Sequence, residues 1–470
     1  MEVKFTVEFA STRFEDLLRF IARYYLRPKR AINRIVHRRV NGVNTLYFRT
    51  LYGRKGWVDV IVYAKQPVLV EMFSTSDVPE GFLIGIKEDI IYQIKLFEEQ
   101  IRKTSLYFTY APDKSLLPTR KRQKKESFLN NLFFGNMLTL ILIFVLVSFT
   151  MYWISVLLGL AFFAPILIIG VQFGIILVSD KIVARFGDWI ITQENPELHI
   201  LQYHLPFEEY RALVKREDVL IDIRQKIFQR TIAIGDEINC RAAKEVFSEY
   251  RIPCVEENFT VKKINLYEIV KMAAEKFNLP LPKIVVADTL VPNAAAIGSG
   301  PDSGVIMITT GIMTQLEENE LLNVIGHELS HLKNRDPLVL FGLFGTEFLL
   351  RVYIFFPFII IFPLIYLLFV FSSLFFVGKF LEARSDLESA IKIGQPAVMA
   401  NALRKIGYRR LHYERIPSHR IMEWIGFDPH PPMYFRISRL EKLKEPVRVS
   451  YPLIRSIKDC IIGFFEALKL

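Results

Sequence analysis

Two long apolar blocks interrupt a chain that is otherwise mixed in polarity. The first block, residues 131–179, carries almost no charge and is long enough for two membrane-spanning helices, which we place at 131–152 and 156–179. The second block, residues 337–378, has room for two more spans with a tight reversal at its central prolines. The pattern therefore predicts a multi-pass α-helical membrane protein with soluble segments between its spans.

The N-terminal segment, residues 1–118, has the mixed periodicity of an α+β domain. Apolar residues alternate with polar ones at its start, which is typical of a half-buried strand: Val3, Phe5, Val7 and Phe9. We expect helices over about 14–25 and 87–102. The runs WVDVIVYA and PVLVEMF, separated by Lys65 and Gln66, predict a β-hairpin.

A strongly basic stretch, RPKRAINRIVHRR at residues 27–39, lies within this domain. We interpret it as a solvated helix face beside an anionic membrane surface. Nucleic-acid binding is the alternative, but no aromatic RNA-binding motif or zinc finger supports it, so no nucleic-acid partner is expected.

Composition agrees with a membrane location. Hydrophobic residues make up 51% of the chain, and the mean hydropathy is +0.26. The formal net charge of +11 fits a membrane protein with basic cytoplasmic flanks as well as it fits a nucleic-acid-binding protein. The three cysteines form no CxxC pair, which argues against a disulfide framework and fits a reducing compartment. The first residues lack the basic and apolar regions of a signal peptide.

Basic residues flank the apolar blocks on one side only, which predicts that the soluble parts face the cytoplasm. These flanking residues are Arg120, Lys121, Arg122, Lys124, Lys125, Lys181, Arg185, Lys333, Arg335 and Lys379. Gly170 and Gly174 form a GxxxG pair that would allow close helix packing. Arg351 lies within the second block. It either pairs with Glu347 four residues earlier or extends to the outer interface.

The pentapeptide HELSH at residues 327–331 is the strongest chemical signal. Leu322, Ile325, Leu329 and Leu332 recur at spacings of three and four, which predicts an amphipathic helix. His327 and His331 then project from the same face and can bind one zinc ion, with Glu328 beside them as general base. HExxH also occurs by chance, on helices with two surface histidines.

A catalytic zinc site needs a third protein ligand. Asn334 and Pro337 occupy the positions of an HxxGxxH continuation, so a downstream carboxylate is required. The sequence KFLEARSDLESA follows the second apolar block. Glu382 can ligate the metal, and Asp386, one helical turn on, can accept the free N–H of a ligand histidine. The two spans between HELSH and Glu382 would bring these residues together at the membrane boundary.

The surrounding sequence resembles a known family. LPKIVVADTLVPNAAAIGSGPDSGVIMITTGIMTQLEENELLNVIGHELSHLKNRD, EARSDLESAIKIGQPAVMANALRKI and HPPMYFRI are similar to the catalytic core of the HtpX-like membrane zinc peptidases, which are related to the type I CAAX prenyl proteases. The resemblance covers about residues 265–440. Two positions depart from the family pattern, Ala383 after the ligand glutamate and Ser385 before the aspartate.

The resemblance implies roles for individual residues. It implies His327, His331 and Glu382 as ligands of one Zn²⁺, Glu328 as base and Asp386 as orienting acid. It further implies that His430 and Arg436 lie near the substrate carbonyl and the Glu382 helix. We expect His430 to stabilise the oxyanion, although a structural His-Pro turn is the alternative. The segment PNAAAIG implies an edge strand for a peptide substrate, formed by Asn293, Ala294, Ala295 and Ala296.

The expected fold is a multi-pass α-helical membrane protein with a mainly α cytoplasmic gluzincin-type zinc peptidase domain, which contains a small sheet, and an N-terminal α+β domain. The expected division is 1–118, basic domain; 131–179, transmembrane hairpin; 185–336, first part of the peptidase domain; 337–378, second transmembrane hairpin; 379–445, second part of the peptidase domain; and 446–470, C-terminal segment.

The expected function is zinc-dependent endopeptidase activity on peptide or membrane-protein substrates at the cytoplasmic face of the cell membrane, in membrane-protein quality control. A CAAX-type prenyl protease, a site-2-type intramembrane protease and an inactive membrane scaffold are the alternatives. The charged residues around HELSH, among them Glu317, Glu318, Glu320, Lys333 and Arg335, argue against a site buried within a span. The sequence leaves the natural substrates and the oligomeric state open.

Overall fold

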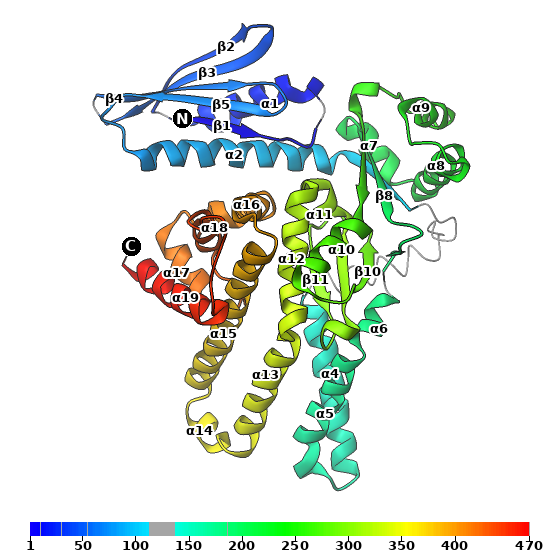
Figure 1. Ribbon diagram of the computed structural model, residues 1–470, viewed down its shortest axis with the longest axis vertical. Helices are drawn as coiled ribbons and strands as arrows, with labels where there is room; N and C mark the ends of the chain where they lie inside the picture. The colour runs from blue at the N-terminus through cyan, green and yellow to red at the C-terminus, as the bar shows by residue number, and fades with distance from the viewer. Residues whose placement is uncertain (10, 30, 54, 112–136, 186, 470) are drawn as a thin grey trace. The chain divides into compact units, whose positions relative to one another are not determined.

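The computed structural model describes residues 1–470 except 10, 30, 54, 112–136, 186 and 470 (Figure 1). The basic run at 120–125 and the start of the first predicted span therefore lie outside the described residues. The chain divides into two compact units. Unit 1 contains Met1–Tyr110 and His199–Lys263, and unit 2 contains Ala111–Leu198 and Ile264–Leu470. The segment predicted as the first part of the peptidase domain, 185–336, is thus shared between the units.

Unit 1 is built around an antiparallel sheet with the order β1-β5-β4-β3-β2. Its strands are β1 (Glu2–Phe5), β2 (Ile32–Val40), β3 (Val43–Tyr52), β4 (Gly56–Tyr63) and β5 (Val68–Ser74). Alternate strand residues such as Val58, Val60 and Val62 are fully buried against α1 (Phe14–Ile21) and α2 (Glu80–Lys103). The predicted hairpin is confirmed, because β4 and β5 pair with each other.

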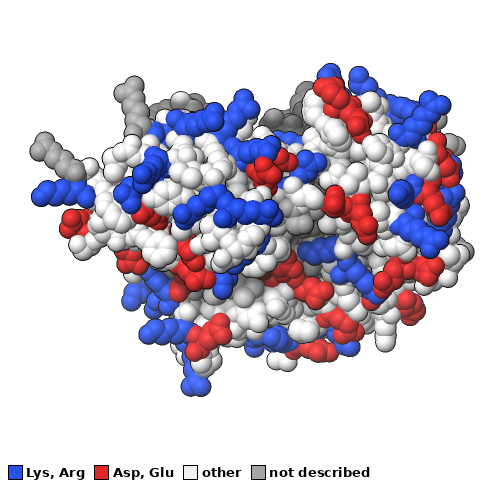
Figure 2. Space-filling view, turned by 90° about the horizontal axis from the view of Figure 1, so that it is seen from above, with Lys and Arg blue, Asp and Glu red and all other residues white. Residues whose placement is uncertain are grey.

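The interpretation of residues 27–39 as a helix is wrong. Most of this stretch forms β2, the edge strand, whose side chains are largely exposed. Charge alone does not encode the hydrogen-bonded partner, β3, that makes this segment a strand. On the face shown in Figure 2, basic side chains are interspersed with acidic ones, as on an ordinary solvated surface.

The rest of unit 1 is a small sheet with helices beside it. The sheet has the order β6-β8-β9, formed by β6 (Ser105–Tyr110), β8 (Glu197–His204) and β9 (Phe259–Asn265). The helices are α7 (Phe207–Val214), α8 (Glu217–Arg230) and α9 (Cys240–Glu249). The sulfurs of Cys240 and Cys254 lie 3.8 Å apart and are not bonded.

Unit 2 combines a four-stranded sheet with a long helical assembly. The sheet has the order β11-β12-β10-β7, with β7 (Trp189–Ile191), β10 (Lys283–Ala287), β11 (Ala294–Ile297) and β12 (Val305–Thr309). β10 and β12 are parallel, and the other two pairs are antiparallel. Helices α10 (Leu266–Phe277) and α12 (Glu318–Asn334) pack against each other, and α6 (Ser179–Ala184) and α11 (Thr310–Gln315) adjoin the strands.

The apolar blocks form helical hairpins (Figure 1). The first contains α4 (Met137–Leu157) and α5 (Ala164–Leu177), so its turn lies later than predicted. The second contains α13 (Asp336–Tyr353), α14 (Phe356–Ile361) and α15 (Pro363–Lys392). Within the described residues, only α15 is long and apolar enough to cross a membrane; 145–157 and 161–177 are shorter apolar helices. Multi-pass insertion therefore remains a proposal.

The structure shows what becomes of two sequence features in these helices, the Glu347–Arg351 pair and the GxxxG pair. Arg351 Nε lies 3.3 Å from Glu347 Oε1, and the hydroxyl of Tyr366 donates to the same oxygen at 3.0 Å, so the ion-pair alternative is realised. A Cβ on Gly170 or Gly174 would have no described neighbour within 4 Å, so this pair makes no close helix contact among the described residues.

The C-terminal part of unit 2 is helical and packs on α15. It comprises α16 (Pro396–Tyr413), α17 (Pro417–Ile425), α18 (Met433–Glu441) and α19 (Pro452–Leu468). One core cluster joins α15 to α17, α18 and α19 through Ala383, Trp424, Phe435 and Cys460. This packing fixes the polar half of α15 against the rest of the unit.

Candidate metal centre

Helix α12 carries HELSH and begins and ends with clear local signals. Glu317 and Glu320 form a reciprocal capping box at its N-terminus, where the first backbone N–H groups lack helical partners. The helix ends at Asn334, because Arg335 adopts a left-handed conformation with φ of 53°. Between these ends, His327 and His331 are one turn apart, and their Nε2 atoms are 3.2 Å from each other.

Glu382 of α15 completes a three-residue cluster with these histidines. Its two carboxylate oxygens lie 3.2 Å from His327 Nε2 and 3.4 Å from His331 Nε2. A tetrahedral zinc with bonds of about 2.0–2.1 Å needs ligand atoms about 3.3 Å apart. Glu382 Oε2 is also buried without a hydrogen-bond donor. The donor set, the spacing and this unpartnered oxygen all fit zinc.

The electrostatics of the cluster favour a cation. Burial would lower the pKa of His327, but the carboxylates of Asp386 and Glu382 outweigh burial and raise that pKa to about 10. Burial would likewise raise the pKa of Glu382, but the charges of His430, His331 and His327 hold it well below its ordinary value. Glu382 therefore stays ionised, and the site attracts positive charge.

The second nitrogen of each histidine faces another carboxylate. Asp386 Oδ1 lies 2.9 Å from His327 Nδ1, and Arg436 donates to both oxygens of Asp386 at 2.7 and 2.8 Å. Asp336 Oδ2 lies 2.7 Å from His331 Nδ1 and forms an ion pair with Arg384. Such contacts fix the ring orientation and leave each Nε2 for a metal. Arg436 is buried on Asp386 and is not exposed toward a substrate.

Glu328 is half-buried and linked to strand β11. Its Oε2 accepts a hydrogen bond from the backbone N–H of Ala296 at 3.0 Å. β11 is an edge strand, and the backbone carbonyl of Asn293 accepts from Thr309 on the side of β12. Because strand groups alternate in direction, the backbone groups of Ala294 and Ala296 face away from β12. The predicted edge and the predicted base are therefore neighbours.

His430 lies in the loop between α17 and α18. Its Nε2 is 3.6 Å from Glu382 Oε2, and its Nδ1 is 2.8 Å from Asp428 Oδ1. The charge of Glu382 raises the pKa of His430, burial opposes this shift, and the hydrogen bond to Asp428 adds to it. The loop is held by Lys379, which donates to the carbonyls of Gly426 and Asp428, and by Arg410, which pairs with Asp428. All eleven predicted site residues therefore lie in unit 2.

Comparison of the sequence with known proteins identifies the family of this chain. The family model described as Peptidase family M48 matches residues 261–444. A protease HtpX homolog from Thermodesulfovibrio yellowstonii is 32% identical over 214 residues, which cover 38% of this chain and 74% of that protein. The chain belongs to the M48 peptidases.

Other relatives agree. Protease HtpX homolog 2 of Methanosarcina acetivorans is 30% identical over 216 residues, covering 38% of this chain and 72% of the relative. A protease HtpX homolog from Thermococcus sibiricus is 43% identical over 96 residues, covering 20% of this chain and 32% of the relative. The predicted resemblance to HtpX-like peptidases is confirmed, and the protein is a metallopeptidase of this type. The M48 match begins after most of unit 1, whose first 110 residues lie outside it.

Three residues of this M48 peptidase were not predicted as part of the site: Asp336, Lys379 and Asp428. Asp336 had a signal in the sequence, since it follows His331 by five residues, but that spacing brings it close only through the left-handed turn at Arg335. Asp428 precedes His430 by two residues, a spacing at which aspartate commonly binds the backbone after it. Of the two departures from the family pattern, Ser385 Oγ lies 3.3 Å from His331 Nδ1, and Ala383 is buried in the core.

Proposed function

We propose that this M48 peptidase is a zinc-dependent endopeptidase of the gluzincin type that cuts polypeptides at the cytoplasmic face of a membrane. The observation that carries the proposal is the cluster of His327, His331 and Glu382 beside Glu328 and an open strand edge. The two Nε2 atoms are 3.2 Å apart, Glu382 Oε2 is 3.2 Å from that of His327, and Glu382 Oε1 is 3.4 Å from that of His331. In this proposal the three residues hold one Zn²⁺. When bound, zinc supplies a Lewis acid that makes water more acidic and polarises a carbonyl.

Glu328 is the proposed general base. Its carboxylate accepts a proton as water attacks the scissile carbonyl carbon, and it returns the proton to the amine nitrogen when the C–N bond breaks. The hydrogen bond from Ala296 N–H holds Oε2 and so orients the carboxylate toward the substrate edge of β11. An extended peptide can pair with the outward backbone groups of Ala294 and with the outward carbonyl of Ala296, as in other β-strand additions.

His430 is the proposed oxyanion donor. Asp428 accepts a hydrogen bond from Nδ1, so a protonated ring keeps Nε2–H for the developing negative charge. The raised pKa of His430 favours this protonated form. Arg410 and Lys379 keep the loop in place during turnover by holding Asp428 and the loop backbone.

The membrane location rests on the apolar helices. The apolar part of α15, residues 363–378, leads directly to Glu382, so insertion of α15 would place the site at the bilayer boundary. The basic residues Lys181, Lys333 and Lys379 support a cytoplasmic orientation. Unfolded or damaged membrane proteins are the substrates that such a position favours, which is consistent with membrane-protein quality control.

A CAAX-type prenyl protease would need a chamber that encloses the site. A cavity of about 670 Å³ does lie among α4, α5 and α13, and its lining includes Gln172, Phe344 and Arg351. None of its described lining residues belongs to the zinc-ligand set or neighbours it in sequence. We therefore favour a general endopeptidase over this alternative.

The test is a comparison of the wild-type protein with Glu328→Gln, both purified in detergent and both analysed for zinc. With an unfolded protein such as casein as substrate, we expect wild type to cleave and the zinc-loaded variant to be inactive. Glu318→Gln, an exposed position in the same helix, is the matched control and should retain activity. Cleavage by zinc-loaded Glu328→Gln at the wild-type rate would exclude Glu328 as the base. Two inactive proteins that both bind zinc would favour the scaffold alternative.

A further inference from the structure

Helix α19 packs on α15 through a face of small residues. Ser456, Cys460, Gly463 and Ala467 are buried, and Cys460 Sγ lies 3.8 Å from the carbonyl oxygen of Lys379. A Cβ on Gly463 would lie only 2.7 Å from the ring of Phe435. Small side chains allow this close approach, so this face of α19 is the one that packs against the rest of unit 2.

The opposite side of α19 carries an exposed apolar stripe. Ile454, Ile461, Phe465 and Leu468 recur at helical spacing, and their side chains are 65%, 39%, 56% and 49% exposed. None of the four forms part of the core cluster on α15. A row of large exposed apolar residues on one side of a helix is costly to leave in water, and such rows mark interaction surfaces.

The end of α17 exposes further apolar residues beside the same helix. Met422, Ile425 and Phe427 are 58%, 45% and 57% exposed. The ring of Phe427 lies 5.7 Å from that of Phe375 in α15, and Phe464 of α19 lies 5.6 Å from Phe376. These seven exposed residues, three from α17 and its end and four from α19, are named the apolar collar.

The apolar collar adjoins α15 at the level of Phe375 and Phe376. Phe375 and Phe376 lie three and two residues before Gly378, where the apolar block ends. At 1.5 Å per residue this is about 3–5 Å along the helix axis. The collar therefore lies where the proposed span leaves the hydrocarbon, which is the depth at which interfacial helices bind.

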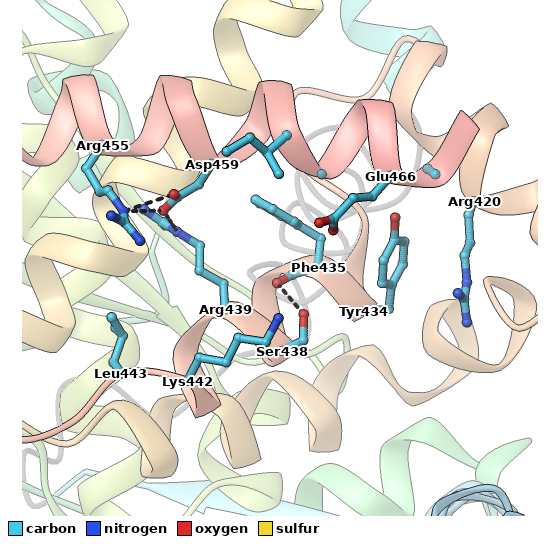
Figure 3. Close-up of a pocket in the computed structure, with 13 residues that line it drawn as sticks. Arg420, Tyr434, Phe435, Ser438, Arg439, Lys442, Leu443, Arg455, Asp459 and Glu466 are labelled. Atoms are coloured by element: carbon cyan, nitrogen blue, oxygen red, sulfur yellow. Dashed lines mark hydrogen bonds and ion pairs between the residues drawn. The ribbon is translucent and has the colours of Figure 1, made fainter. Parts of the chain in front are cut away.

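Basic groups lie next to the collar. Lys458 of α19 and Lys469, the residue after this helix, are exposed, and a cavity of about 560 Å³ is lined by residues of α18 and α19. Figure 3 shows Arg420, Lys442 and Arg455 around this cavity. Its lining also includes Glu466 and Asp459; Asp459 is already paired with Arg439 and Arg455. Ile462 lines the cavity and is 45% exposed, so the cavity adjoins the stripe.

We propose that α19 and the end of α17 form an interfacial membrane anchor. The apolar collar inserts into the headgroup–acyl boundary of one leaflet, and the basic groups of α19 and the adjoining cavity bind anionic phospholipid headgroups. Binding of a second copy of the chain or of another protein would not require the apolar collar to lie level with the end of the span. The observed level therefore favours a membrane as the occupant. This proposal rests on the proposed membrane location of α15. It adds a lipid-binding surface that holds the catalytic half of α15 at the bilayer boundary.

Fluorescence quenching in vesicles tests the depth of the collar. Single cysteines are placed at Phe465 in the collar, at Leu368 in the apolar part of α15 and at Met272 in α10, all of which are exposed. The background is full-length Cys240→Ser/Cys254→Ser; buried Cys460 is kept, and this background without an added cysteine is the labelling control. Each cysteine carries an environment-sensitive fluorophore. The vesicles contain equal parts of phosphatidylcholine and phosphatidylglycerol, with nitroxide lipids labelled at a shallow or a deep position.

We expect the shallow nitroxide to quench the label at Phe465 more than the deep nitroxide does. We expect the deep nitroxide to quench the label at Leu368 more than the shallow one does. Neither nitroxide should quench the label at Met272. Deep quenching at Leu368 without quenching at Phe465 would overturn the anchor and leave the membrane location intact. Deep quenching at Phe465 would also overturn it, because α19 would then be inserted rather than interfacial. Absence of quenching at Leu368 would overturn the membrane location and the anchor together.

Charge is tested with the same Phe465 label. Vesicles of phosphatidylcholine alone, or the substitutions Lys458→Glu and Lys469→Glu, should reduce shallow quenching at Phe465 and leave quenching at Leu368 unchanged. Equal quenching at Phe465 in neutral and anionic vesicles would contradict the proposed preference for anionic lipid.

Discussion

The carboxylate of Asp336 lies 2.7 Å from Nδ1 of His331, while Nε2 of the same ring faces Glu382. Asp336 is buried, and Arg384 neutralises its charge. His327 is held in the same manner by Asp386. Each histidine of the cluster therefore has its own buried carboxylate, which sets the ring orientation before any metal arrives.

Replacement of Asp336 by asparagine should weaken zinc binding. The substitution keeps the size of the side chain but removes the charge that orients His331, and the loss of such partners typically lowers metal affinity about 10–100-fold. Zinc affinity is measured by competition with a chromophoric chelator. Glu318→Gln removes an exposed charge from α12 and should leave the affinity unchanged. Wild-type affinity in Asp336→Asn would show that Asp336 has no part in metal binding.

The site could be predicted from sequence where helical periodicity determines position. His327 and His331, and likewise Glu382 and Asp386, are four residues apart on single helices, so their common faces follow from local geometry. Asp336 and Asp428 depend on a left-handed turn and on a loop, and neither has a periodic signal. The strand β2 was missed because its identity depends on β3 rather than on its own charges.

Asp428→Asn should slow catalysis without removing zinc. Loss of an oxyanion donor costs about 10²–10³-fold in kcat, so His430→Gln should show a loss of this size. Asp428→Asn should show a smaller loss in the same direction, because it acts through His430. Steady-state kinetics with a peptide substrate, together with zinc analysis, measure both effects. The exposed control Asp77→Asn should match wild type. A normal kcat in His430→Gln would support the structural His-Pro turn instead.

Unit 1 should lose stability in mild acid because of His204. Burial, with a smaller contribution from the charge of Arg13, lowers the pKa of His204 from 6.5 to about 4. Between these values the unfolded state binds more protons than the folded state, so stability falls as pH falls from 6.5 toward 4. Hydrogen exchange of peptides from β6 and β8, corrected for the intrinsic effect of pH, measures this loss. His204→Gln should flatten the pH dependence, whereas the exposed control His37→Gln should not. If the stability of His204→Gln depended on pH as steeply as that of wild type, other groups would be responsible for the loss of stability in acid.

Gly326→Ala should disturb the metal centre through packing alone. A Cβ at this position would lie 2.8 Å from Ser389 Oγ and from a side-chain carbon of Ile393, both at the C-terminal end of the α15 segment. Helices α12 and α15 carry the two histidines and Glu382 respectively, so any separation of these helices lengthens the ligand triangle. Overpacking of this kind costs about 1–3 kcal/mol of stability, and zinc affinity should fall with it. Pulse proteolysis in detergent and chelator competition measure the two effects. Gly342→Ala in α13 is the matched control, since its Cβ would meet no described atom within 4 Å. If Gly326→Ala were as stable as Gly342→Ala and bound zinc normally, the close contact between α12 and α15 would not be what sets the ligand spacing.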